Sequence, residues 1–210
     1  MKVCAFGLKV IKSRYVSKRL RSSSQLLVFG GAVNMIIRPA ELGDLNVCFT
    51  IDHSYQTDYV WQMEERKEEG HVTVTFRAVR LPRTMRVDYP RDRDYLLDNW
   101  RRGECFLVAD QDGEVRGYLD MTVQTWHATG WINNLAVRKR HRRQGIGGAL
   151  LKAAMEWARE QGLRQLMFET QTKNYPAICF YRKHRFIFCG FNDRYYTNQD
   201  IALFFAQSLR

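Results

Sequence analysis

The sequence has little of what several classes of protein require. Collagen-like, coiled-coil and repeat compositions are all absent. No stretch approaches the ~20 apolar residues of a membrane-spanning helix, because the longest candidate, Leu26–Ile37, is broken by Gly30, Gly31 and Asn34. Hydrophobic residues nevertheless make up 45% of the 210 residues and aromatic residues 13%, which excludes a wholly disordered chain. This length and composition suit one domain with at most a short extra segment.

Cysteine and histidine patterns for metals or disulfides are also missing. The five cysteines are odd in number and form no CxxC pair, and the five histidines show no HExxH spacing. The pattern indicates reduced thiols in a cytoplasmic protein, and we expect no metal site.

Acidic residues are absent from residues 1–34, which carry seven basic ones. Removing these seven from the 33 basic residues leaves 26 against 22 acidic residues, so the formal net charge of +11 lies mainly in this segment. We therefore do not expect a nucleic-acid partner. The alternative is that the basic segment binds nucleic acid, and it predicts that deleting residues 1–34 abolishes the binding. The segment could be a disordered arm, a targeting peptide or a stretch upstream of the working protein. Because Met35 begins the first strand-like run, the third interpretation is favoured slightly, with the domain at 35–210.

Helical and strand patterns alternate after Met35. The predicted helices are 41–55, 94–102, 145–161 and 175–184, and the predicted strands are 71–80, 105–109, 115–125, 131–137, 166–169 and 186–191. Residues 81–93 are rich in proline and charge and are predicted to be a loop. The alternation indicates an α/β fold.

One stretch, from Leu135 to the helix that starts at Gly145, has a pattern typical of a phosphate-binding site. The strand Leu135–Val137 leads into a basic, glycine-rich turn, and an amphipathic helix starts at Gly145. Glycines at a helix N-terminus allow close approach of a ligand to free backbone N–H groups, which favour phosphate. The GxxxxGK and GxGxxG fingerprints are missing, so the local pattern leaves a phosphate site or a tight structural turn open.

The motif Arg142-x-x-Gly145-x-Gly147 resembles the acetyl-CoA pyrophosphate loop of the GNAT family of N-acetyltransferases. A second stretch, with Asn174, Ala177, Phe180-Tyr181 and Phe186, resembles another signature of that family, although Arg185 replaces its usual glycine. The resemblance covers about residues 35–210 and is strongest over 105–190. The segment 168–174 looks like that of streptothricin acetyltransferases.

The resemblance implies a mixed, mostly antiparallel twisted sheet flanked by helices, whose fourth and fifth strands (Trp131–Val137 and Leu166–Glu169) run parallel and splay apart. It also implies acetyl-CoA as co-substrate, held between those strands and by the following turn. The implied cofactor-binding residues are Leu135, Ala136, Val137, Arg142, Arg143, Gln144, Gly145, Ile146, Gly147, Gly148, Ala149 and Asn174.

The resemblance implies catalytic roles for two residues. Tyr181 corresponds to the general acid that protonates the leaving thiolate, and Glu169 is the candidate general base, directly or through water. Without the resemblance, Tyr181 could be a packed helix residue and Glu169 a structural carboxylate. Asn133 and Asn134 could instead position a water.

The acceptor is the most open part of the hypothesis. Residues 52–69 combine carboxylates with aromatic side chains, which suits a cationic amine such as a streptothricin-type antibiotic, but an ordinary charged helix face has the same pattern. Asp120, Trp126 and Asp193 are further candidates for the acceptor side. The alternatives are acetylation of a protein N-terminus or lysine and a non-catalytic acetyl-CoA sensor. The resemblance also implies a possible homodimer.

Overall fold

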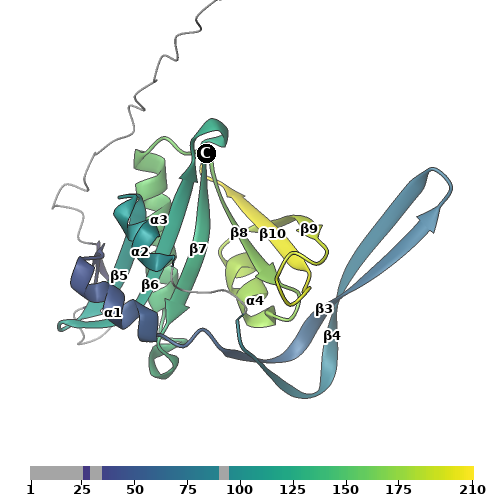
Figure 1. Ribbon diagram of the computed structural model, residues 1–210, viewed down its shortest axis with the longest axis horizontal. Helices are drawn as coiled ribbons and strands as arrows, with labels where there is room; N and C mark the ends of the chain where they lie inside the picture. The colour runs from purple at the N-terminus through teal and green to yellow at the C-terminus, as the bar shows by residue number, and fades with distance from the viewer. Residues whose placement is uncertain (1–25, 29–34, 90–94) are drawn as a thin grey trace, which may run out of the picture.

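The computed structural model describes residues 26–28, 35–89 and 95–210. Within them, an eight-stranded sheet has the order β1-β2-β5-β6-β7-β8-β10-β9, and β3 and β4 form a separate two-stranded ribbon (Figure 1). In chain order the strands are β1 (Leu26–Val28), β2 (Met35–Pro39), β3 (Tyr55–Glu68), β4 (His71–Val87), β5 (Cys105–Gln111), β6 (Glu114–Gln124), β7 (Thr129–Val137), β8 (Gln165–Gln171), β9 (Ile187–Asn192) and β10 (Ala202–Ser208). The helices are α1 (Leu42–Thr50), α2 (Leu96–Arg101), α3 (Ile146–Glu160) and α4 (Tyr175–Lys183), with short 3₁₀ turns at Thr125–His127 and Lys139–His141.

Helices cover both faces of the large sheet. Along β5, Phe106 and Val108 belong to the hydrophobic cluster that includes residues of α1 and α2. The alternate residues Leu107 and Ala109 belong to the cluster that includes α3 and α4. Because successive side chains of a strand point to opposite faces, β5 forms part of two cores at once.

The predicted parallel pair is confirmed as β7 and β8. Thr129–Ile132 of β7 pair in parallel with Gln165–Phe168 of β8, and the pairing stops there. Beyond Ile132 the strands diverge, as Figure 1 shows. The other described strand pairs are antiparallel, so the predicted mixed, mostly antiparallel sheet with one splayed pair is confirmed.

The ribbon of β3 and β4 extends away from the rest of the molecule (Figure 1). Its base is anchored by Trp61, whose backbone N–H donates to the Thr172 carbonyl at 2.9 Å and whose ring lies 5.9 Å from that of Phe188. The prediction of a loop over 81–93 is wrong for residues 81–87. Strand β4 continues to Val87, which lies opposite Tyr55. Pro82 lies where the two strands shift register, and the missing N–H of proline is tolerated at such a bulge.

Strand β1 lies inside the predicted N-terminal extension and pairs with β2, with Val28 opposite Met35. The remaining residues of 1–34 lie outside the described part of the chain, so the boundary at Met35 stays a prediction. The four described cysteines, Cys48, Cys105, Cys179 and Cys189, are free thiols. None of the described helices is both long enough and apolar enough to cross a membrane.

Candidate active site

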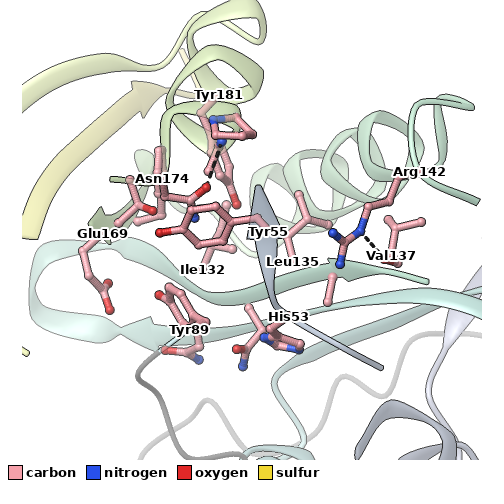
Figure 2. A pocket seen from close by; sticks show the side chains of 17 residues that line it. His53, Tyr55, Tyr89, Ile132, Leu135, Val137, Arg142, Glu169, Asn174 and Tyr181 are labelled. Carbon is pink, nitrogen blue, oxygen red and sulfur yellow. Dashed lines mark hydrogen bonds between the residues drawn. The ribbon is translucent and has the colours of Figure 1, made fainter. Parts of the chain in front are cut away.

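A pocket of about 220 Å³ opens where β7 and β8 part (Figure 2). Its walls come from both strands, from α4, from the turn before α3 and from the segment that leads into β3. Residues far apart in the sequence therefore meet here. Seven predicted site residues line it: Leu135, Ala136, Val137, Arg142, Glu169, Asn174 and Tyr181.

The main chain of β7 offers hydrogen-bonding groups to this pocket. The Arg138 N–H donates to the Arg116 carbonyl on β6 at 2.9 Å. Since backbone groups alternate in direction along an antiparallel strand, those of Ala136 also point toward β6. Those of Leu135 and Val137 point the other way, into the gap where β8 has separated. An extended ligand could pair with these two residues as an added strand would.

The glycine-rich turn presents the N-terminus of α3. Arg143 and Gly145 both have positive φ angles, of 67° and 86°, and the turn they make aims the first amides of α3 outward. The free donors belong to Ile146, Gly147 and Gly148. Ala149, which was predicted to bind the cofactor, has no free amide to offer, because its N–H donates to the Gly145 carbonyl at 3.0 Å.

The side-chain donors of Arg142 hold backbone carbonyls at the pocket edge, so its predicted role in cofactor binding stays a prediction. Its Nε donates to the Val137 carbonyl at 2.9 Å, as Figure 2 shows, and its Nη1 and Nη2 donate to the carbonyls of Ser54 and Asp52 at 2.8 and 2.6 Å. Burial lowers the pKa of this guanidinium. The side chain therefore ties the end of β7 to the segment before β3. Arg143 and Gln144 are exposed beside it, where they can reach a phosphate.

Asn174 occupies the N-cap position of α4. Its Oδ1 accepts a hydrogen bond from the Ala177 N–H at 3.2 Å, the second dashed line in Figure 2. Pro176 in the first turn of α4 suits this start because proline lacks the N–H that would be unpaired there. The cap holds Asn174 at the pocket wall.

Glu169 is 5% exposed and lines the pocket from β8. Its Oε2 accepts a hydrogen bond from the Trp131 indole N–H at 2.6 Å. A buried carboxylate favours a cationic or proton-donating partner. The predicted base is thus placed where an amine could reach it.

Tyr181 enters the pocket from α4 and is 6% exposed (Figure 2). Its ring stacks on that of Phe168, with centroids 3.5 Å apart. Burial raises the pKa of the phenol above its ordinary value of 10. The hydroxyl therefore keeps its proton at neutral pH, as a general acid must.

His53, Tyr55 and Tyr89 also line the pocket, and no sequence pattern predicted a role for His53 or Tyr89. His53 exchanges a hydrogen bond with the Tyr118 hydroxyl at 2.9 Å, and the Tyr55 hydroxyl donates to Gln171 Oε1 at 3.0 Å. No local pattern marks these residues, because the path of the chain between α1 and α2 brings them here.

Asn133 and Asn134 line the pocket, and both bind Asp120. Their Nδ2 groups donate to the buried Asp120 carboxylate, at 3.1 Å and 2.5 Å. Asp120 therefore lies beneath the pocket wall and does not face an acceptor directly.

The acidic residues of 52–69 do not line the pocket. Glu64 and Glu65 lie on the ribbon and pair with Arg66 and Lys67, at 3.2 and 3.1 Å. Asp52 pairs with Lys139 at 2.8 Å. Among the described residues, no group of three or more His, Cys, Asp or Glu side chains is arranged to hold a metal ion.

Comparison with known proteins agrees with this geometry. The sequence matches the model of the acetyltransferase (GNAT) family over residues 74–186. It is 27% identical to the streptothricin acetyltransferase of Streptomyces lavendulae over 164 residues, which are 76% of this chain and 85% of that one. The structure is similar to a crystal structure of nourseothricin acetyltransferase, with a TM-score of 0.71 and 26% identity over 84% of this chain and 99% of that one.

A Bacillus anthracis (str. Ames) protein crystallised in complex with acetyl coenzyme A has the same fold. Its TM-score is 0.69, with 22% identity over 83% of this chain and 98% of that one. The family match covers more than half of the chain, and the splayed strands and glycine-rich turn agree with it. This protein belongs to the acetyltransferase (GNAT) family.

Proposed function

We propose that this protein transfers the acetyl group of acetyl coenzyme A to a primary amine of a small cationic acceptor. The observation that carries the proposal is the meeting of Glu169 and Tyr181 in one pocket, at the point where β7 and β8 part. The free amides at the start of α3 follow the turn at the end of β7. The complex of the similar Bacillus anthracis protein with acetyl coenzyme A supports the choice of co-substrate.

The residues present fit this co-substrate. The amides of Ile146, Gly147 and Gly148 would hold its pyrophosphate, and the backbone of Leu135 and Val137 would pair with its extended arm. A Cβ added to Gly147 would be in ordinary contact with the Phe180 ring at 3.5 Å, whereas one added to Gly145 would have no neighbour within 4 Å. When bound, the group supplies an acetyl thioester, which is an activated acyl donor.

Glu169 and Tyr181 move the protons that the transfer needs. The Glu169 carboxylate accepts one proton from the acceptor ammonium, directly or through water, and the lone pair freed on nitrogen forms the new C–N bond. As the C–S bond breaks, the Tyr181 hydroxyl donates its proton to the departing sulfur, and the second proton lost by the nitrogen restores the Tyr181 phenol. The Trp131 indole N–H holds the carboxylate in place.

A streptothricin-type antibiotic is the first acceptor to test. The similarity to streptothricin and nourseothricin acetyltransferases extends over most of the chain and supports it. The competing acceptor class is the N-terminus or a lysine of a protein.

The test measures release of free thiol from acetyl coenzyme A by the full chain with streptothricin, aminoglycosides, polyamines, amino acids and N-terminal peptides. We expect turnover with streptothricin and a large loss in Tyr181→Phe. Turnover with peptides and none with the small amines would overturn the acceptor class. Absence of thiol release with every amine would overturn the proposed function.

A further inference from the structure

A row of aromatic side chains flanks Glu169 on the face of the sheet opposite Phe168. Glu169 on β8 lies directly opposite Phe204 on β10, so the two side chains share one face of the sheet. Trp131 on β7 lies opposite Met167, two residues before Glu169 and therefore on the same face. Trp131 and Phe204 flank the carboxylate, and their ring centroids are 6.0 Å apart.

Tyr195 extends this row beyond the sheet. It follows β9, and its ring meets that of Phe204 edge-on, with centroids 5.5 Å apart and an interplanar angle of 90°. Tyr195 is 42% exposed, and Trp131 and Phe204 are partly exposed. The wall of Trp131, Phe204 and Tyr195 is thus open to solvent while the carboxylate beside it is buried.

Aromatic faces next to a buried carboxylate attract positive charge. The ring quadrupole binds an ammonium or guanidinium within about 6 Å of the centroid, and more strongly where water is partly excluded. Catalysis needs Glu169 for only one amine, the one that is acetylated. A second positive group on the same acceptor would lie over the aromatic wall.

We propose that Trp131, Phe204 and Tyr195 form a subsite for a second cationic group of the acceptor, so that the enzyme selects diamines and polyamines over monoamines. The inference rests on the proposed function and deepens it. Glu169 and Phe204 are opposed across β8 and β10, and the Cβ atoms of opposed residues are about 5 Å apart. The acetylated nitrogen beside Glu169 and the second nitrogen over Phe204 would therefore be separated by roughly four methylene groups. The acidic side chains of the ribbon do not line the pocket and have no part in this selection.

The experiment compares 1,4-diaminobutane with butylamine, which has the same chain and one nitrogen fewer. The wild-type enzyme should have the higher kcat/KM for the diamine. Phe204→Leu and Tyr195→Leu should each lower kcat/KM for the diamine by about three- to thirty-fold and change that for butylamine less than about twofold. Tyr59→Leu is the matched control, since Tyr59 is 38% exposed and its ring packs on that of Tyr175 on α4, with centroids 5.2 Å apart.

Equal losses for the two amines, or a wild-type enzyme without preference for the diamine, would overturn the subsite. Calorimetry of 1,4-diaminobutane binding tests it without turnover. If no amine releases thiol, the proposed function fails, yet weaker diamine binding in Phe204→Leu would still support the subsite. Unchanged binding in both variants would contradict it.

Discussion

The two sides of the gap between β7 and β8 are built in different ways. The proposed cofactor side comes mainly from one continuous stretch, 135–148, and would use backbone amides and carbonyls. The proposed acceptor side would use side chains of Trp131, Glu169, Tyr195 and Phe204, which three strands and a loop bring together. The backbone geometry of the first side is local and leaves a sequence motif, whereas the aromatic residues of the second side are brought together by strand pairing, and no local motif marks them.

Arg142 stands between these two sides. It belongs to the motif by sequence, yet its donors hold the carbonyls of Val137, Ser54 and Asp52. It thereby positions the segment carrying His53 and Tyr55 against the cofactor strand. The difference between the two sides predicts which variants should lower kcat/KM for the acceptor and which should weaken the binding of acetyl coenzyme A.

Glu169→Gln should have the largest effect and tests the acceptor side alone. Glutamine retains an oxygen for the Trp131 N–H but accepts no proton, so kcat/KM for the amine should fall by about 10²- to 10⁴-fold. The dissociation constant of acetyl coenzyme A, measured by calorimetry, should not change. Glu156→Gln on α3 is the control. If Glu169→Gln weakened the binding of acetyl coenzyme A as much as it lowered kcat/KM, the cofactor and acceptor sides would not be independent.

Tyr181→Phe should lower kcat by about a hundredfold, because the leaving sulfur loses its proton donor. Burial raises the pKa of Tyr181 above 10, so the phenol stays protonated below that pH. The wild-type rate should therefore rise as the amine deprotonates and show no fall between about pH 8 and pH 10. A decline over that range would contradict the assignment of Tyr181 as a buried acid.

Arg142→Gln should lower kcat/KM for the acceptor about tenfold, since loss of these hydrogen bonds frees the segment before β3. The dissociation constant of acetyl coenzyme A should change less than about twofold. Arg140→Gln removes the same charge from an exposed position in the same cluster and should leave both constants near wild type. If Arg142→Gln, and not Arg140→Gln, lowered the affinity for acetyl coenzyme A tenfold, Arg142 would be a cofactor-binding residue and this prediction would be wrong.

Arg143→Gln should have the smallest effect. Its exposed side chain can contact a cofactor phosphate only through a screened interaction, so affinity for acetyl coenzyme A should fall about two- to threefold. The loss should disappear in high salt, where surface charges are screened. Titrations at two salt concentrations check this, and a loss that persists in high salt would show a closer contact.

Much of the fold could be predicted because its patterns are local. The period of α3, the Asp112-Gly113 turn between β5 and β6 and the glycine stop after α3 all depend on neighbours in the sequence. The ribbon was predicted only in part. No strand was predicted for β3, where a charged helix face was an alternative, and the second strand continues through Pro82 and a charged stretch. Pairing with β3 outweighs those local signals.

The sequence by itself determined the backbone turn at the start of α3 and the types of residue available for acid–base chemistry. A glycine at positive φ and a row of unpaired amides follow from the residues themselves. Only the tertiary structure decided which side chains share the pocket, that Arg142 binds carbonyls, and that aromatic rings flank Glu169. The physical reason is that these contacts join segments up to 90 residues apart, and their positions depend on how the strands pair and diverge.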